Sequence, residues 1–365
     1  MEALPIKTKI LFLGGYLGAG KTTLALHLAK ALNKSGKSVA VVMNDQGNVL
    51  VDTQFMENAG VDVREVIGAC FCTKFDEFVK NARSLVDIKR PDIIIAEPIG
   101  TSTSLMSSVI TPMKSQYGNE FQVLPLFVVV DGRRANDELA HSDELGLGDR
   151  KLIPIHQMHE AEFLVISKMD LLTSDESRAI KQQVSKEVPD AEIFEFSALD
   201  DRNLALLLEI INSDRETQKK VLAVDQRLFS MEKAAMGWYS IACKITTNGK
   251  KVDSYDLLMG AMKDISRRFR PEDIAHIKVL LSSPTIGVKI SLVEDSIQVD
   301  GVKGGRYLIG DGEFVLNSRV RSMPEPLKTS IEKALEVAFA NAGLTVMERK
   351  VACFTPKPDV PKFLL

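Results

Sequence analysis

A glycine-rich turn between an apolar run and a helical pattern constrains this chain more than any other feature. In the stretch KILFLGGYLGAGKTTL, residues 9–24, the order Gly15, four residues, Gly20, Lys21, Thr22 has the spacing of a phosphate-binding loop. Glycines let backbone amides fold around phosphate oxygens, the lysine ammonium can bridge the β- and γ-phosphates, and the threonine hydroxyl can bind Mg²⁺. Because such a loop needs a strand before it and a helix after it, the pattern predicts an α/β fold.

Six apolar runs within about the first 210 residues extend this prediction. They are KILFLGG, KSVAVVMND, PDIIIAE, QVLPLFVVVD, AEFLVISKMD and AEIFEFSA, and each is continuously apolar rather than alternating. Runs of this kind form strands that are buried on both faces, so we expect a parallel sheet with helices on both faces. A helix is predicted from Thr23 to Ser35, ending before Gly36.

The pattern of strands and helices restarts after a charged stretch. We expect a phosphate-loop domain at residues 1–212, a partly helical linker at 213–236, a second domain at 237–356 and an extended, proline-rich tail at 357–365. The second domain contains two successive strand-helix-strand units, which predict a small α+β, ferredoxin-like domain with an extra hairpin. A chain of 365 residues is long enough for two such cores.

Charge and cysteine content exclude several classes of partner. Forty-six basic and 49 acidic side chains give a net charge of −3, so no overall basic field favours nucleic acid or an anionic membrane. The first apolar run is too short for a signal peptide and no segment approaches a membrane span, so we expect a soluble, cytoplasmic protein. Four cysteines are too few for a disulfide scaffold and are expected to be thiols or metal ligands.

Two acidic motifs follow strands of the predicted sheet. PDIIIAEPIG places Glu97 where a carboxylate can hold the Mg²⁺ shell, and the amide of Gly100 can contact a γ-phosphate. MNDQGNVLVD offers Asp45 and Asp52 as switch carboxylates near the metal, of which Asp45 is preferred. Plainer interpretations stay open, since NDQG is also an ordinary turn and an acid at a strand end is often just solvated.

The motif SKMD, at the end of another buried strand, indicates which base is bound. The Asp170 carboxylate can accept hydrogen bonds from both the ring N–H and the exocyclic amine of guanine, whereas adenine presents an unprotonated ring nitrogen there. Lys168 would lie along the base plane, and Ser197 and Ala198 of EFSALD would support the base from the neighbouring loop. We therefore expect the nucleotide to be GTP.

These motifs define a set of expected site residues. The nucleotide-binding residues are Gly15, Gly18, Ala19, Gly20, Lys21, Thr22, Thr23, Gly100, Ser167, Lys168, Asp170, Ser197 and Ala198. Catalysis is assigned to Lys21, Asp45 and Glu97, and Mg²⁺ binding to Thr22, Asp45 and Glu97.

The order of the motifs resembles a known family. GGYLGAGKTTL, VVMNDQG, IGACFC, IIAEPIG, VVVDG, ISKMD and FSALD follow one another as in the CobW-like GTPases, also labelled cobalamin-synthesis proteins. These are relatives of the nickel-insertion GTPases for urease and hydrogenase and of the GTPase chaperone of methylmalonyl-CoA mutase. The similarity is strong over about residues 8–212, and beyond them it rests on domain order and length.

The resemblance implies a GTP-hydrolysing chaperone that delivers a metal or services a corrinoid-dependent or metal-dependent client protein. In that family the glutamate that matches Glu97 takes the place of an aspartate, and the acid that matches Asp45 belongs to the switch region around Mg²⁺. We identify no arginine finger in the sequence, so slow intrinsic turnover is expected, with acceleration by a partner or by homodimerisation.

The metal motif of the family departs from its usual form in this chain. The family pattern is C-x-C-C, and IGACFCT supplies Cys70 and Cys72 but has Thr73 in the third position. Zinc or another thiophilic metal needs about four ligands, so two thiolates make half a site at most. A second chain, a nearby histidine or an exogenous ligand would have to complete it. Cys70 and Cys72 are therefore interpreted either as a metal site or as ordinary thiols.

Other candidate ligands have plainer interpretations. His156 and His159 have a spacing that suits one helical face, but such pairs are more often solvated or packed than ligating. Cys243 and Cys353 lie within strand patterns and are expected in a core.

Two other functions remain open from the sequence alone. One is an ATP-dependent enzyme that transfers a phosphoryl group to a small acceptor, and the other is a module that binds nucleotide without hydrolysing it. Nucleotide preference separates the first from a GTPase, and phosphate release with and without Mg²⁺ separates the second.

Overall fold

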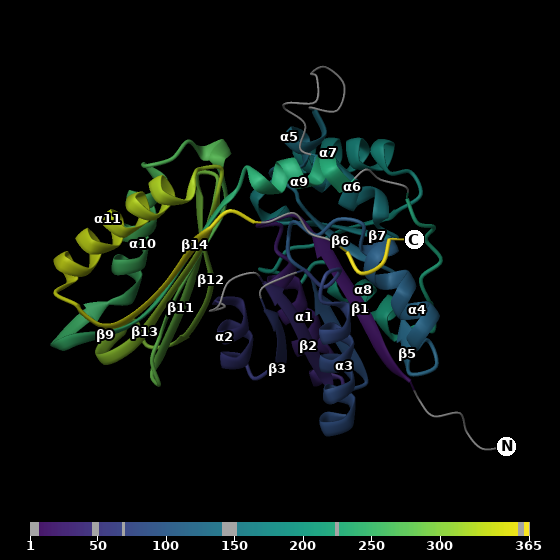
Figure 1. Ribbon diagram of the computed structural model, residues 1–365, viewed down its shortest axis with the longest axis horizontal. Coiled ribbons are helices and arrows are strands. Elements are labelled where there is room, and N and C mark those ends of the chain that lie inside the picture. Colours follow the sequence, from purple (N-terminus) through teal and green to yellow (C-terminus); the bar gives the residue numbers. More distant parts are fainter. Residues whose placement is uncertain are drawn as a thin grey trace. The chain divides into compact units, whose positions relative to one another are not determined.

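The computed structural model describes residues 7–45, 51–67, 70–140, 152–222, 226–356 and 361–364 (Figure 1). The chain divides into two compact units. The first comprises Met1–Gln46, Gly60–Glu232 and Asp359–Leu365, and the second comprises Gly47–Ala59 and Lys233–Pro358. A short segment of the N-terminal half thus folds with the C-terminal unit, a grouping that differs from the ranges expected from the sequence.

The first unit is built on a parallel sheet of eight strands, in the order β3-β2-β4-β1-β6-β7-β8 with β5 also beside β1. Because successive side chains in a strand point to opposite faces, the full burial of Ile10, Leu11, Phe12 and Leu13 in β1 means that both faces are covered. The predicted fold class is confirmed. The strands are β1 (Thr8–Gly15), β2 (Val39–Asp45), β3 (Asp62–Ile67), β4 (Ile93–Glu97), β5 (Phe121–Val123), β6 (Phe127–Asp131), β7 (Phe163–Ser167) and β8 (Glu192–Glu195).

One strand of this sheet was not predicted from the sequence, and two strands that were predicted as one are separate. Strand β3 lies at the edge of the sheet, where Asp62 and Arg64 are exposed, and its sequence DVREVI contains three charged residues. It therefore has neither a continuous apolar run nor a strict alternation. The run QVLPLFVVVD forms two strands, β5 and β6, which are separated around Pro125. A proline cannot donate to a strand ladder, which explains the break.

Helices connect these strands. Helix α1 begins at Lys21 rather than at the predicted Thr23 and ends at Lys34, one residue before the predicted end. A π-helical turn, Met106–Ile110, precedes α4. The helices are α1 (Lys21–Lys34), α3 (Phe75–Lys89), α4 (Thr111–Tyr117), α5 (Ala135–Ala140), α6 (Leu152–Glu160), α7 (Ser174–Glu187) and α8 (Leu204–Asn212), and α9 (Gln226–Ala234) leads into the second unit.

The second unit is a six-stranded antiparallel sheet in the order β12-β11-β10-β13-β9-β14. Strands β10-β13-β9-β14 have the ferredoxin-like order, and β11 and β12 form the extra hairpin, so this prediction is confirmed. The elements are β9 (Gly237–Asp253), α10 (Ser254–Ser266), β10 (Ile274–Ser282), β11 (Ile286–Val293), β12 (Ser296–Gly304), β13 (Tyr307–Val320), α11 (Pro324–Ala342) and β14 (Thr345–Phe354).

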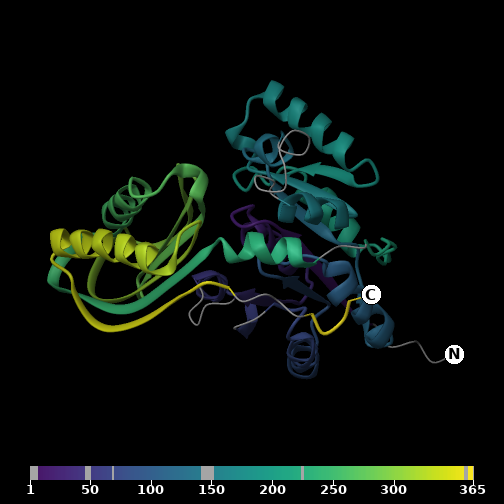
Figure 2. The same cartoon turned by 45° about the horizontal axis from the view of Figure 1, so that its top comes forward.

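The two faces of this second sheet are covered by different parts of the chain. Helices α10 and α11 pack on one face and form the main core of the unit (Figure 1 and Figure 2). Helix α2 (Val51–Asn58) lies on the other face, where Val51 packs against Leu280 and Val315. The helix that follows β2 in the sequence is therefore held by the C-terminal sheet.

Candidate nucleotide-binding site

The loop between β1 and α1 has a backbone that requires glycine. Gly15 has a φ of +131°, and a Cβ atom there would lie 2.3 Å from the carbonyl oxygen of Val129 in β6. Gly20 has a φ of +97° and directly precedes the first residue of α1. Gly18 and the buried Ala19 complete the turn. The loop amides and the N-terminus of α1 thus lie at the carboxyl edge of the sheet, where α/β proteins bind phosphates.

The side chains that follow the loop form a polar cluster. Lys21 donates from Nζ to the carbonyl oxygens of Gly15 at 2.9 Å and Tyr16 at 3.2 Å. The Thr22 hydroxyl donates to Glu97 Oε1 at 2.8 Å, and both side chains are buried. A hydroxyl and a carboxylate are oxygen ligands of the kind that Mg²⁺ prefers, so these two residues fit the expected metal. Thr23 is half-buried in the first turn of α1.

Asp45 is the last residue of β2. Met43, two residues earlier, is the register partner of Glu97 in β4, so the backbone of Asp45 lies at the same edge of the sheet as this cluster. The side chain of Asp45 lies outside the described part of the structure.

Gly100 lies directly against the phosphate loop. A Cβ atom at this position would approach the backbone nitrogen of Leu17 to 2.8 Å, so only glycine fits. The carbonyl of Gly100 accepts a hydrogen bond from Gln157 Nε2 at 3.0 Å, and the same amide donates to the carbonyl of Ser102 at 2.6 Å. Helix α6 therefore holds the segment after β4 through Gln157, a residue with no recognisable motif in the sequence.

Helix α6 contributes a second anchor to the same segment. Glu160 accepts hydrogen bonds from the backbone N–H groups of Leu105 at 3.2 Å and Met106 at 2.9 Å. Burial raises the pKa of Glu160 to about 7, although these N–H groups act in the opposite direction. Burial also lowers the pKa of His156, one turn earlier, to about 4, and the charge of His159 adds to this effect. His156 is thus a packed, neutral side chain at pH 7.

The expected base-binding residues partly come together. Asp170 accepts a hydrogen bond from the Ser197 hydroxyl at 2.8 Å, and Ala198 follows in the same loop. The Ser167 hydroxyl donates to the carbonyl of Ala19 at 2.6 Å, which ties the SKMD motif to the phosphate loop. Lys168 pairs with Asp131 at 2.7 Å.

A buried ionic network lies beside the loop and was not apparent from the sequence. Arg134 donates to the carbonyl of Leu17 at 2.7 Å and lies 3.6 Å from Asp131 and 3.3 Å from Glu138. Burial alone would raise the pKa of Asp131, but Lys168 and Arg134 outweigh it and lower that pKa. Because Arg134 is buried and bound to Asp131, Glu138 and the carbonyl of Leu17, it holds the backbone of the phosphate loop in place. Only its position just after β6 distinguishes it in the sequence.

The cysteine motif is attached to both segments that border the nucleotide site. Cys70 Sγ lies 2.7 Å from the hydroxyl of Ser102, in the segment after β4. At the end of β2, Asn44 accepts from the backbone N–H of Phe71 at 3.0 Å and donates to the carbonyl of Val66 at 2.7 Å. Both Cys70 and Cys72 are buried thiols.

The structure supplies no third protein ligand for these thiols among the residues it describes. There, no three His, Cys, Asp or Glu side chains gather into a metal-binding group. His156 packs against Phe229, and His159 pairs with Glu187 at 2.8 Å. Completion of the site by either histidine, one of the options left by the sequence, is not supported by this arrangement.

The remaining cysteines are structural. Cys243 lies in the core of the second unit, where burial raises its pKa to about 11. Cys353 is half-buried against the same core, and its thiol donates to the carbonyl of Pro324 at 3.1 Å.

Asp52 has a different environment from the one expected. Its carboxylate accepts hydrogen bonds from Lys278 and, at 2.9 Å, from Lys289, both in the C-terminal sheet. Burial would raise the pKa of Asp52, but the two ammonium groups outweigh it and hold that pKa well below its usual range. The charge of Asp52 is compensated by lysines of its own unit, which favours a structural role over that of a metal-side switch carboxylate.

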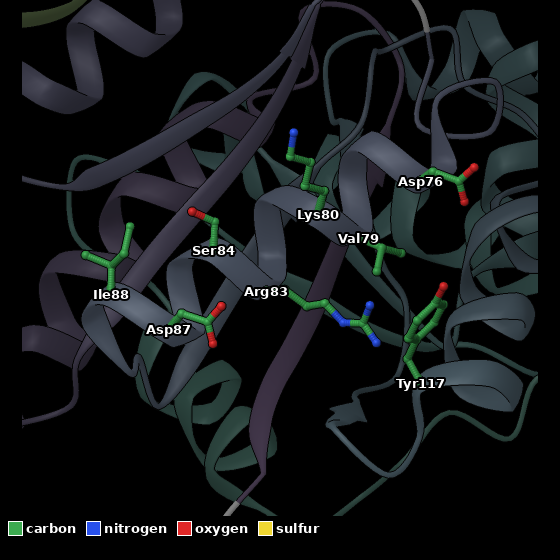
Figure 3. Close-up of a pocket in the computed structure, with 8 residues that line it drawn as sticks. All are labelled: Asp76, Val79, Lys80, Arg83, Ser84, Asp87, Ile88 and Tyr117. Atoms are coloured by element: carbon green, nitrogen blue, oxygen red, sulfur yellow. The ribbon is translucent and has the colours of Figure 1, made fainter.

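A shallow cavity of about 610 Å³ lies along α3 (Figure 3). It follows one side of the helix from Asp76 to Ile88 and is bordered by Tyr117. No residue of the phosphate loop lines it, so it is separate from the nucleotide site. In the parts of the chain that the structure describes, no helix combines the length and hydropathy needed to cross a membrane.

The chain is similar in sequence to known nucleotide-binding proteins. The sequence profile of the CobW/HypB/UreG nucleotide-binding domain matches residues 9–195, more than half of the chain. Zinc chaperone CobW of Pseudomonas aeruginosa is 26% identical over 221 residues, which cover 52% of this chain and 57% of that protein. Zinc chaperone YeiR of Escherichia coli is 25% identical over 178 residues, covering 48% of this chain and 51% of that protein.

The matched region spans only about half the length of these curated relatives. Among solved structures, HypB from Helicobacter pylori in complex with nickel is 17% identical, with a TM-score of 0.43. That match covers 60% of this chain and 93% of the HypB chain.

Proposed function

Because this chain belongs to the CobW/HypB/UreG family of P-loop GTPases, we propose that it hydrolyses GTP with Mg²⁺ and uses the cycle to hand a metal ion to a client protein. The observation that carries the proposal is the convergence of Lys21, Thr22 and Glu97 at the phosphate loop. The hydrogen-bonded pair Asp170 and Ser197 adds a candidate base site. The zinc-chaperone names of the two curated relatives support the metal-delivery part.

Each residue of the site has a defined role in this proposal. Lys21 exchanges its bonds to loop carbonyls for bonds to the β- and γ-phosphates when nucleotide binds. Thr22, Glu97 and Asp45 would hold Mg²⁺, and the bound ion would neutralise charge on the phosphate oxygens. The carboxylate of Asp170 accepts from the two donors on the edge of guanine.

Gly100 connects the nucleotide to the cysteine motif. We expect its amide to contact the γ-phosphate. Its carbonyl accepts a hydrogen bond from the Gln157 side chain, which also donates to the backbone carbonyl of Ser102. Ser102 in turn contacts Cys70. A shift of Gly100 on hydrolysis would therefore be passed to the thiol of Cys70 through the side chain of Gln157 and through Ser102, which is a physical route for coupling metal release to GTP.

The metal in this proposal is zinc or another thiophilic ion. Cys70 and Cys72 supply two soft ligands, and the client, a second copy of the chain or an exogenous group supplies the others. We further propose that residues 1–212 act as the GTPase domain, apart from Gly47–Ala59, which folds with the second unit. Residues 237–356 would form the second domain after the linker 213–236, and the protein would work in the cytoplasm, where thiols stay reduced.

Nucleotide selectivity tests the proposal directly. Competition binding with GTP, ATP and xanthosine triphosphate should show a strong preference of the wild type for GTP, by up to ~10⁴-fold, because a mismatched base leaves a polar group unpaired. Asp170→Asn should lose GTP and gain xanthosine triphosphate, because the amide donates where the carboxylate accepts. The matched control is Asp175→Asn, an exposed acid in the first turn of α7.

Equal affinity of the wild type for ATP and GTP would replace this proposal with its alternative, an ATP-dependent phosphoryl-transfer enzyme. Tight GTP binding without phosphate release, with and without Mg²⁺, would instead indicate a binding module.

A further inference from the structure

A short segment from the far end of the sequence lies on the cysteine motif. The backbone N–H of Lys362 donates to the carbonyl of Cys72 at 2.8 Å. The ammonium of Lys362 donates to the two carboxylate oxygens of Asp76 at 2.5 and 2.7 Å. The ring of Phe363 meets that of Phe75 edge-on, with the centroids 5.1 Å apart. Two consecutive residues thus make a backbone, an ionic and an aromatic contact within the first unit.

The surface under this segment is suited to a basic residue followed by an aromatic one. Phe75 is fully buried, and its ring also lies 6.1 Å from that of Tyr117, which in turn lies under Arg83. Asp76 stands beside it in the first turn of α3 and also borders the cavity of Figure 3. The exposed carboxylate of Asp76 is complementary in charge to Lys362, and the neighbouring ring of Phe75 offers an aromatic surface to Phe363.

We propose that residues 362 and 363 form a reversible cover over the cysteine motif and limit access to Cys72. Cys72 is only 3% exposed and Cys70 only 1%, so an incoming metal or client reaches these thiols only after something moves. The cover is held by weak contacts, since the Lys362 and Asp76 side chains are 43% and 71% exposed and their attraction is screened. The role of the cover in controlling metal or client access rests on the proposed function, whereas the shielding of Cys72 does not.

The weakness of these contacts makes the cover a better candidate for movement than the core around the thiols. Cys70 is fixed by Ser102 and the neighbouring Phe71 by Asn44, both buried contacts. Opening of Lys362 and Phe363 disrupts one exposed ion pair, one ring contact and one backbone hydrogen bond. A client that presents a basic and an aromatic residue would compete for the same surface.

Thiol accessibility tests the cover without nucleotide, metal or client. The full chain is treated with N-ethylmaleimide, and labelling of each cysteine is followed over time by peptide mass spectrometry. Lys362→Glu with Phe363→Ala should label Cys72 about tenfold faster than the wild type, since an exposed ion pair and an aromatic contact are lost. Cys243, in the core of the second unit, is the internal control and should keep its rate. Lys186→Glu, an exposed lysine of α7, controls for the change in charge.

A charge exchange gives an independent result. Asp76→Lys alone should speed the labelling of Cys72, and Asp76→Lys with Lys362→Asp should bring it back toward the wild-type rate because the pair is rebuilt with reversed charges. Unchanged labelling of Cys72 in the double variant, or no recovery in the exchanged pair, overturns the proposal. If Cys72 and Cys243 are both labelled faster in the double variant, the whole fold has been loosened. Recovery of the Cys72 labelling rate in the exchanged pair then supports the cover, and no recovery overturns it. These labelling results are independent of the GTP selectivity that tests the proposed function.

Discussion

The ion pairs of Asp52 hold α2 on the C-terminal sheet, and their removal should loosen that helix. Asp52 is bound by Lys278 and Lys289. The side chain of Lys289 is only 2% exposed, lies 4.3 Å from the ring centre of Phe55, and has Asp300 at 3.6 Å as a second partner. Asp52→Asn keeps the size of the side chain but removes its negative charge, so the positive charges of Lys278 and Lys289 are no longer neutralised by this residue.

The expected loss follows from burial. Breaking one partner of a buried ion pair costs about 3–5 kcal/mol. Because Asp300 stays near Lys289 and Lys278 is 17% exposed, we expect the low end, about 3 kcal/mol. For a unit of this size, about 1 kcal/mol corresponds to roughly 3–4 °C, so the Tm of the second unit should fall by about 10 °C.

The stability lost in Asp52→Asn should become smaller at acidic pH. The pKa of Asp52 is depressed in the folded state below its ordinary value of 3.8. The stability that this group contributes is therefore fully present above about pH 4 and is lost as the pH falls from there toward the folded pKa. The difference in unfolding free energy between the wild type and Asp52→Asn should be constant near pH 7 and shrink below pH 4.

Calorimetry and hydrogen exchange together check this prediction. Amides of Val51–Asn58 should exchange faster in Asp52→Asn, since the helix is released before the sheet unfolds. Asp311→Asn, an exposed acid of β13, is the matched control. A Tm and an α2 exchange rate equal to those of the control would refute the reasoning, because Asp52 would then carry no buried ionic contact worth measuring.

Three further predictions concern the first unit. Glu97→Gln should keep GTP affinity within a few-fold but lower phosphate release by about tenfold or more, because the charge beside Thr22 is lost while the hydrogen-bonding reach remains; equal release rates would transfer the metal role to Asp45. Glu160 has a folded pKa of about 7 against an ordinary 4.5, so the wild type should lose stability relative to Glu160→Gln as the pH rises from 4.5 to 7. Thermal unfolding across that range checks this, and a constant difference would contradict it. Cys70→Ser with Cys72→Ser should reduce the zinc bound by protein purified without chelator or affinity tag, measured by elemental analysis with and without GTP, whereas equal zinc contents would make both cysteines ordinary thiols.

The sequence by itself determined the local parts of this protein. The phosphate loop is recognisable because glycines at fixed spacing, followed by Lys21 and Thr22, have few other uses between a strand and a helix. The parallel sheet and the ferredoxin-like unit were also predictable, because continuous apolar runs and helical periodicity report burial directly. The C-terminal end of α11 at Gly343 also follows from the local sequence, because glycine commonly ends a helix in the left-handed conformation, and Gly343 has a φ of +67°.

The tertiary structure decided which distant residues meet. Gln157, Glu160 and Arg134 have no signal of their own in the sequence, and they matter only because strand register brings α6 and the turn after β6 beside the phosphate loop. Strand β3 was missed because this edge strand contains three charged residues and so shows neither a continuous apolar run nor a strict alternation. Asp52 was expected near the nucleotide because it follows β2, yet α2 packs on the C-terminal sheet, where two lysines meet its charge. Local periodicity reports how much of a segment is buried, but the partner that buries it is set by contacts across hundreds of residues.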